Sequence, residues 1–289
     1  MAKRLMVVLG ALVVLGLVLS ACATPTPEVI KETVVVEATV EVEKTVEVEK
    51  EVEVTATPEP EEPAGPKTMV VCMGQEPDTL WFYGGDMLAS SHILQAVYDG
   101  AALGGIDTRT YAYQPVILEK LPDLDDGDAA IDAVTVQAGD MVVDDAGDPV
   151  ELAEGMMVRP AGCRSTDCAV EFDGSPLEMD QMSATFTLLE GITWSDGTPL
   201  TADDSVYGFE LNADPDTPTS RFTVERTASY EATDDMTAVW TGLPGYIDST
   251  YFVNWWPPFP RHLWQEELGY TAADLLEAEE SSRMPMGYG

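Results

Sequence analysis

The chain has 289 residues, and its 14 lysines and arginines face 52 aspartates and glutamates, which gives a formal net charge of -38 at pH 7. A surface this acidic repels phosphate backbones, so the composition argues against nucleic acid as a partner and is typical of a solvated surface that keeps a protein in solution. The two histidines, His92 and His262, lie far apart in the sequence and offer little base chemistry.

The N-terminus has the pattern of a secretory signal peptide. Lys3 and Arg4 precede an uninterrupted apolar run, 5–19, and small residues follow it. The run is shorter than the roughly 20 apolar residues of a membrane span. The sequence Leu19-Ser20-Ala21-Cys22 matches the bacterial lipobox, so we predict that residues 1–22 are a signal peptide and that Cys22 carries the lipid that anchors the protein to the outer side of the cell membrane. The alternative is an ordinary signal peptide with a chance cysteine.

Residues 23–66 form a low-complexity segment rich in valine, glutamate and proline. The sequence TVEVEK occurs at Thr39–Lys44 and again at Thr45–Lys50. Strict Val/Glu alternation has the period of a strand, but a lone ribbon is marginal in water and its glutamates repel one another. We predict an extended spacer; the alternative is β-pairing with copies on neighbouring molecules.

The following residues, 67–289, are predicted to hold the folded domain. An apolar run at 68–73 predicts a strand, in which Cys72 is a small buried hydrophobe. A helical pattern covers 87–99 and ends at Gly100. The stretch 121–182 is rich in aspartate and glycine and predicts turns and small hairpins.

Cys163 and Cys168 lie five residues apart in a loop-like sequence of a chain bound for an oxidising compartment, which predicts a disulfide. A metal site needs more soft ligands than this pair offers. The acidic run 123–128 fails the EF-hand test, because positions six and twelve hold Asp128 and Val134, so a solvated loop is favoured over calcium. No metal or cofactor is predicted.

The stretch 183–218 reads as a strand, a turn and a capped helix. Apolar and polar residues alternate from Ala184 to Leu188, and Asp196-Gly197 predicts a tight turn. Thr201 stands three residues before Asp204 at a helix start, and Pro215 ends that helix. Nothing in this unit requires catalysis.

Several motifs are spread along 67–289: EPDTL (Glu76–Leu80), YDG (Tyr98–Gly100), WSDGTPLTADDSVY (Trp194–Tyr207), DPDT (Asp214–Thr217), ATDDMTAVW (Ala232–Trp240), PPFPRHLW (Pro257–Trp264) and MGYG (Met286–Gly289). Together they resemble the family 5 extracellular solute-binding proteins, the oligopeptide, dipeptide and nickel receptors of ABC importers. The resemblance implies an α/β fold: a periplasmic-binding-protein-like (type II) lobe with mixed sheets, and an extra subdomain at about 123–182. Family members are longer and have two lobes, so we expect this chain to be the N-terminal part of such a receptor.

The resemblance also implies ligand contacts at two places. The first is Asp86, Met87 and Leu88, where family peptide binders add the ligand backbone as a strand. The second is Arg221 or Phe222, just after the DPDT motif. Packing on a helix face is an equal alternative for Met87 and Leu88, and a surface role is favoured for Arg221.

The Trp255-Trp256 pair is expected to pack in the core and not to form an aromatic platform. The function implied by the resemblance is a lipid-tethered receptor that performs no chemistry, captures a peptide or similar solute and delivers it to the permease subunits of an ABC importer. Two alternatives remain: an exported glycosidase-like hydrolase, because carboxylates are plentiful, and a surface scaffold. Against a hydrolase, the acidic residues fall in turns and caps, and no G-x-S-x-G elbow occurs.

Overall fold

The computed structural model describes residues 70–100 and 103–289, which belong to one compact unit, Met69–Gly289. The predicted signal peptide, Cys22 and the spacer at 23–66 lie outside the described residues. Among the helices of the described part, none has the length and apolarity needed to cross a bilayer.

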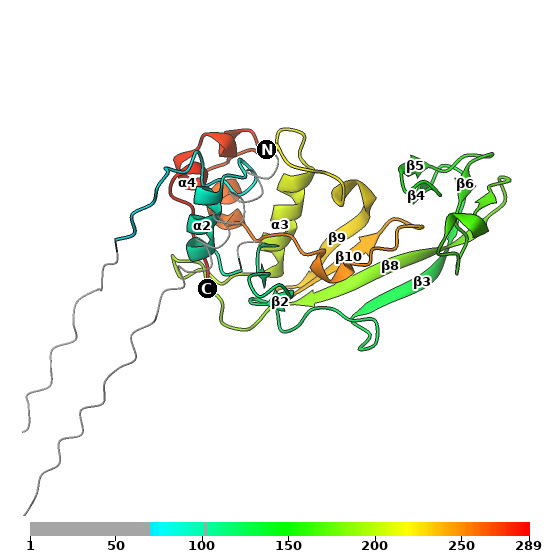
Figure 1. Cartoon of the computed structure of the whole chain (residues 1–289), viewed down its shortest axis with the longest axis horizontal. Helices are drawn as coiled ribbons and strands as arrows, with labels where there is room; N and C mark the ends of the chain where they lie inside the picture. The colour runs from blue at the N-terminus through cyan, green and yellow to red at the C-terminus, as the bar shows by residue number, and fades with distance from the viewer. Residues whose placement is uncertain (1–69, 101–102) are drawn as a thin grey trace, which may run out of the picture. The chain divides into compact units, whose positions relative to one another are not determined.

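The centre of the unit is a four-stranded sheet in the order β3–β8–β10–β9 (Figure 1). Its strands are Ala129–Val136 (β3), Leu177–Thr187 (β8), Thr237–Gly242 (β10) and Thr227–Asp234 (β9). The alternation predicted at 184–188 is confirmed in β8, where Ala184 and Phe186 are fully buried. Their side chains join the main hydrophobic core with Trp240 of β10.

The expectation of mixed sheets is wrong for the described residues, because every strand pair in their sheets is antiparallel. The reason is local for β9 and β10: only Asp235 and Met236 connect them, and a parallel pair needs a crossover of a dozen or more residues. In the described part, the isolated bridge between Tyr98 and Tyr288 is parallel. The coarser expectation of a mixed α/β domain is confirmed.

Helix α3, Ala202–Ala213, packs against β9 and β10. Thr201 and Asp204 form the predicted capping box, in which the Asp204 carboxylate accepts a 2.9 Å hydrogen bond from the Thr201 amide. The helix ends before Pro215, as predicted. Gly208 allows the closest approach, since a Cβ there would lie 2.0 Å from the carbonyl oxygen of Pro257.

Helix α2, Leu88–Val97, confirms the helix predicted at 87–99, with Met87 as its N-cap. The strand predicted at 68–73 is wrong where the structure describes it, because residues 70–73 pair with no strand there and Val70 is 83% exposed. For the same reason Cys72 is an exposed free cysteine and not a buried hydrophobe.

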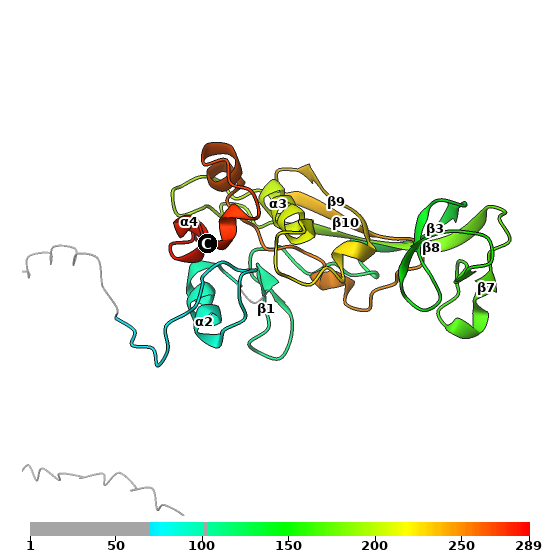
Figure 2. The same cartoon turned by 90° about the horizontal axis from the view of Figure 1, so that it is seen from above.

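The extra subdomain lies where β3 ends and β8 begins (Figures 1 and 2). It contains two hairpins, formed by β4 (Met141–Val143) with β5 (Pro149–Glu151) and by β6 (Met157–Val158) with β7 (Val170–Glu171). They enclose a small core of their own. Small hairpins were predicted here; strand β3 and the first half of β8, which carry them, were not. The predicted disulfide between Cys163 and Cys168 is confirmed, with the two Cα atoms 5.7 Å apart.

The remaining elements are short. They are β1 (Ile106–Asp107) paired with β2 (Gln114–Pro115), single helical turns at Thr166–Cys168, Val224–Arg226, Tyr251–Val253, His262–Glu267 and Asp274–Leu276, and α4 (Glu279–Ser282). The chain end lies between α2 and the WSDG turn: the Tyr288 amide donates to the Val97 carbonyl at 3.2 Å, and the Ser195 amide donates to the Gly287 carbonyl at 2.9 Å.

Candidate functional site

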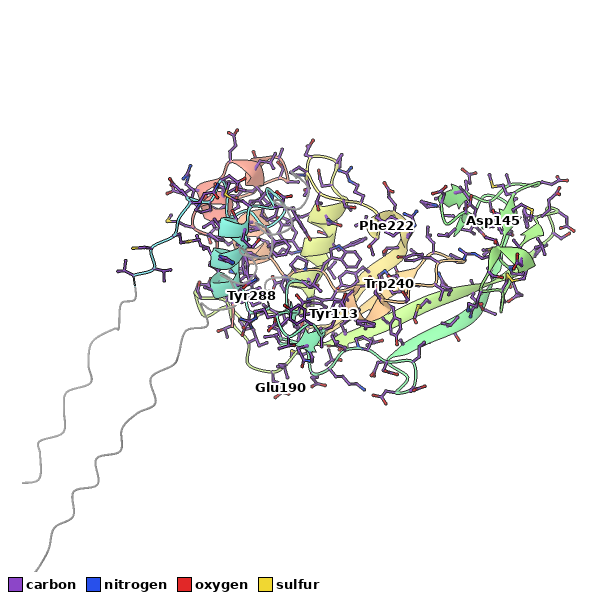
Figure 3. The ribbon with its side chains drawn as sticks, in the orientation of Figure 1. Tyr113, Asp145, Glu190, Phe222, Trp240 and Tyr288 are labelled. Atoms are coloured by element: carbon purple, nitrogen blue, oxygen red, sulfur yellow. A yellow bond between two sulfur atoms is a disulfide. The ribbon has the colours of Figure 1, made fainter. Side chains whose placement is uncertain are left out.

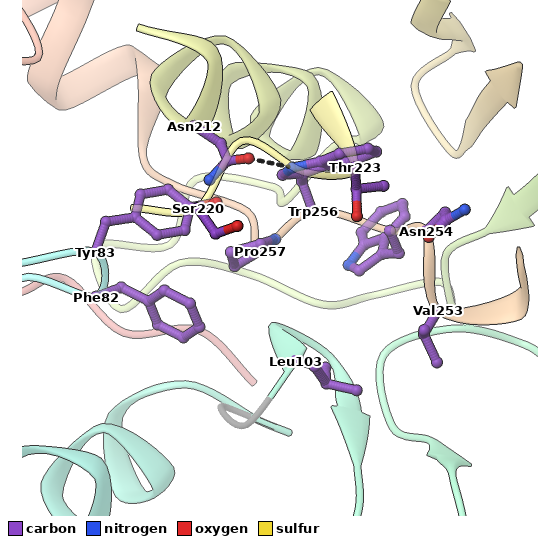
Figure 4. A pocket seen from close by; sticks show the side chains of 11 residues that line it. Phe82, Tyr83, Leu103, Asn212, Ser220, Thr223, Val253, Asn254, Trp256 and Pro257 are labelled. Carbon is purple, nitrogen blue, oxygen red and sulfur yellow. Dashed lines mark hydrogen bonds between the residues drawn. The ribbon is translucent and has the colours of Figure 1, made fainter. Parts of the chain in front are cut away.

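A pocket of about 230 Å³ opens beside the C-terminal half of α3 (Figure 4). Its walls come from four separate parts of the chain: Phe82 and Tyr83, Leu103, the α3 end with the segment after it (Asn212, Ser220 and Thr223), and Val253–Pro257. None of these lining residues carries a formal charge. The pocket is therefore suited to neutral polar and apolar groups and not to an ion.

The two tryptophans of the wall are held by hydrogen bonds at their indole nitrogens. Trp255 Nε1 donates to the Gly104 carbonyl at 2.8 Å, and Trp256 Nε1 donates to Asn212 Oδ1 at 3.2 Å. Trp256 also packs against the rings of Phe209 and Tyr230, at centroid distances of 4.8 and 4.7 Å. The predicted packing role of the pair is confirmed, and the same fixed rings line the pocket.

Two buried asparagines place amide groups at the pocket. Asn212 is 7% exposed and uses its Oδ1 for Trp256, so its Nδ2 has no acceptor among the described residues. Asn254 is its counterpart: its Nδ2 donates to Asp248 Oδ2 at 3.0 Å, and its Oδ1 has no donor within the described part of the chain. These two side chains thus offer the pocket an unused donor group and an unused acceptor, which are the two kinds of partner that a peptide group requires.

Tyr83 contributes a neutral hydroxyl to the opposite wall. Its OH donates to the Gly208 carbonyl at 3.2 Å, at the same point where Pro257 comes close to α3. Burial raises the pKa of the Tyr83 hydroxyl well above its ordinary value, so this group stays protonated at any physiological pH. It acts as a positioned polar contact and not as a base.

The first predicted contact segment lies near this pocket but does not line it. Asp86, Met87 and Leu88 form the entry to α2, where Met87 is the N-cap and the Leu88 side chain is 69% exposed. The residues of this region that reach the wall are Phe82 and Tyr83, which precede them.

The second predicted segment lies between two lining residues, Ser220 and Thr223. Arg221 donates from Nη2 to the Asp214 carbonyl at 2.7 Å and so closes the turn after α3. Phe222, on the segment between α3 and β9, is 57% exposed, and the Arg226 guanidinium lies 3.8 Å from its ring centroid (Figure 3). None of the five predicted residues lines the pocket; the lining residues nearest to them in the sequence are Tyr83, Ser220 and Thr223.

Sequence reasoning missed the two asparagines. Asn212 stands seven residues after Ser205 on α3, and both face inward, so the helix period was the one available signal for it. Asn254 follows no periodic pattern and had no such signal.

An α/β unit with an uncharged, rigid aromatic pocket has the properties of a binding protein, and comparison with known proteins agrees with this class. Residues 177–252, which include β8, α3, β9 and β10, match the model described as bacterial extracellular solute-binding proteins, family 5 middle. Over this segment, the chain is similar to the family 5 solute-binding proteins. No curated protein matches the chain.

Three of the similar solved structures come from oligopeptide-binding proteins. One, from Thermus thermophilus in complex with a pentapeptide, is 16% identical over 67% of this chain and 25% of its own, with a TM-score of 0.44. A second, from Bacillus subtilis with a nonapeptide, is 18% identical over 73% of this chain and 31% of its own, with a TM-score of 0.44. The third, a mannohexaose-bound protein from Thermotoga maritima, is 30% identical over 36% of this chain and 19% of its own, with a TM-score of 0.29. This chain therefore spans a third or less of the length of each.

Proposed function

We propose that this chain is part of a lipid-anchored, extracytoplasmic receptor that captures peptides for an ABC importer. The family match over 177–252 supports the receptor role. The pair of unused amide atoms on Asn212 and Asn254 is the observation that favours peptides, because a peptide group has one donor and one acceptor to satisfy.

The pocket has room for only a small part of a peptide. A volume of about 230 Å³ lies below the 300–1,000 Å³ that is typical of complete ligand sites. We infer that it holds one residue of the ligand, with the remainder of the peptide covered by a second lobe as in two-lobed receptors. Residues Asp86–Leu88 and Arg221–Phe222, which lie close in the sequence to the lining residues Tyr83, Ser220 and Thr223, are proposed to contact the adjoining ligand residues.

Tryptophan fluorescence tests this proposal directly, since Trp255 and Trp256 line the pocket. The full-length protein is titrated with a panel of di- to hexapeptides, and we expect a saturable fluorescence change with at least one of them. Absence of a saturable change with every peptide would contradict the proposal.

The Asn212→Asp variant isolates the amide donor. Aspartate retains an oxygen that accepts from Trp256 Nε1, but it replaces the free Nδ2 donor with a second acceptor. Because an unmade hydrogen bond of a buried group costs about 1.4 kcal/mol or more, we expect affinity to fall about tenfold. The matched control is Gln137→Glu, the same change on an exposed amide outside the pocket, which is expected to leave affinity unchanged.

Binding without turnover distinguishes a receptor from an exported hydrolase. We expect the peptides, and a panel of oligosaccharides, to be recovered intact by mass spectrometry after prolonged incubation with the protein. Recovery of cleaved products would favour the hydrolase instead.

A further inference from the structure

A second cavity, of about 110 Å³, lies in the extra subdomain, apart from the aromatic pocket. Its lining consists of Arg159, Cys163, Arg164, Asp180, Gly245 and Ile247. Since a water molecule occupies about 30 Å³ in the liquid, the cavity has room for a group of a few heavy atoms.

The cavity is lined by both of the basic residues in the segment that surrounds it. Residues 121–182 are strongly acidic, and Arg159 and Arg164 are the only basic side chains that the sequence places among them. Both line this one cavity. Two arginines distributed at random over an acidic surface would not be expected to line the same cavity.

Arg159 has no carboxylate partner within the described residues. Its Nη2 donates to the carbonyl oxygens of Gly245 and Asp144, at 3.2 and 3.4 Å, and its Nε is buried with no acceptor there. A guanidinium retains its charge at all relevant pH values. The residue is half-buried, so part of its guanidinium is shielded from water without an ionic partner, and a compensating group would stabilise it.

Asp180 is the only carboxylate in the lining, and Arg164 already uses it. Arg164 Nη1 and the Gly162 amide, the latter at 2.7 Å, both donate to Asp180 Oδ2. The lining thus holds two guanidinium groups and one carboxylate, which leaves the cavity with a net charge of about +1. The disulfide between Cys163 and Cys168 closes the loop that carries Arg164, so this group is held in place before any ligand arrives.

We propose that this cavity binds one small oxyanion, a carboxylate or a phosphate, between Arg159 and Arg164. The planar fork of a guanidinium matches the oxygen spacing of such anions, and the ligand supplies the charge that Arg159 lacks. The acidic residues farther away oppose binding less than their number suggests, because salt screens exposed charges beyond about 10 Å. This site is independent of peptide capture by the aromatic pocket.

The test measures the melting temperature of the full-length protein while acetate or inorganic phosphate replaces chloride at constant ionic strength. A ligand that binds only the native state raises stability by RT ln(1 + [L]/Kd), so we expect a rise that saturates. The anion that saturates at the lower concentration identifies the preferred oxyanion. If neither anion gives a saturable rise, the proposal is overturned.

Charge variants separate this site from a general salt effect. Arg159→Gln is expected to abolish the saturable rise, while Arg109→Gln, an exposed arginine on the loop between β1 and β2 that pairs with Asp107, retains it. Asp180→Asn removes the competing negative charge and is expected to lower the half-saturating concentration several-fold. An equal saturable rise of the melting temperature in the Arg159→Gln and Arg109→Gln variants would overturn the proposal. If the Arg159 variant does not fold, the Asp180→Asn variant provides the test. A half-saturating concentration that is unchanged or higher in this variant would overturn the proposal.

Discussion

At the residue scale, the carboxylate of Asp204 connects three parts of the chain. It accepts hydrogen bonds from the Thr201 amide at 2.9 Å, from Trp194 Nε1 at 3.2 Å and from the Arg261 amide at 3.4 Å. The residue is 6% exposed. Burial raises the pKa of this carboxyl above its ordinary value, and the hydrogen bonds from Thr201, Trp194 and Arg261 only partly offset that effect.

This raised pKa predicts a pH dependence of stability. Between the ordinary pKa and the raised one, the native state binds more protons than the unfolded state, so the contribution of Asp204 to the free energy of unfolding falls as pH rises. In the Asp204→Asn variant this contribution is absent, while one side-chain acceptor remains. We therefore expect the stability of the wild type relative to the variant to be highest in acid and to decline as pH rises through the raised pKa. Urea denaturation of both proteins from about pH 3 to pH 7 measures this stability difference.

The control is Asp203→Asn, which removes an exposed charge from the same helical turn. A stability difference between wild type and Asp204→Asn that stays constant with pH, or grows as pH rises, would contradict the prediction.

Single residues were predictable where their role is local. The spacing of Thr201 and Asp204 predicts a cap because both partners lie within one turn of helix. The role of Asn212 depends on Trp256, which lies 44 residues away in the sequence. The exposure of Cys72 likewise depends on which strands are available as neighbours, and its own apolar segment carries no information about them.

At the scale of elements, the disulfide lies in the loop that connects strands β6 and β7 of the extra subdomain. Cys163 follows β6, and Cys168 precedes β7. Within this loop, Arg164 reaches Asp180 on β8, so the covalent link and the ion pair restrain the same segment.

Removing the link by Cys163→Ala with Cys168→Ala is predicted to lower the free energy of unfolding by only about 2 kcal/mol, because the unfolded chain gains little entropy when so short a loop is opened. Guanidinium denaturation of the double variant checks this value. Cys72→Ala is the control, since it removes an exposed thiol that belongs to no disulfide. A loss well above this magnitude would show that the loop also supports packing that the entropy argument omits.

Elements were predictable where a pattern marks both their period and their ends. Helix α3 has a cap and a terminating proline, and β8 alternates along its second half. Strand β3 was missed because its burial does not alternate: Ala129 and Val136 are buried, but the residues between them are half-buried or exposed in no regular order. The pairing of β3 with β8 joins segments that are separated by both hairpins, and no local pattern specifies it.

At the scale of the whole molecule, the family match over 177–252 was predictable although the sheet was not. Motifs such as WSDGTPLTADDSVY record the turn, the cap and the helix start, and the matched segment 177–252 includes them. Strand direction is different, since it depends on which segments meet in space. The two-residue loop between β9 and β10 requires these strands to be antiparallel, but the sequence contains no comparable signal for the directions of the other strand pairs.

Attachment to a membrane is the remaining prediction at this scale, and it rests on the lipobox cysteine, Cys22. Two or more acyl chains on that residue, each buried CH₂ contributing about 0.8 kcal/mol, anchor a protein durably, and a protein without them partitions into water. We expect Cys22→Ala to move the protein out of the membrane fraction and to abolish incorporation of labelled fatty acid, whereas Cys72→Ala changes neither. If Cys22→Ala remains in the membrane fraction as fully as the wild type, the leader itself serves as the anchor, and the thiol has no part in it.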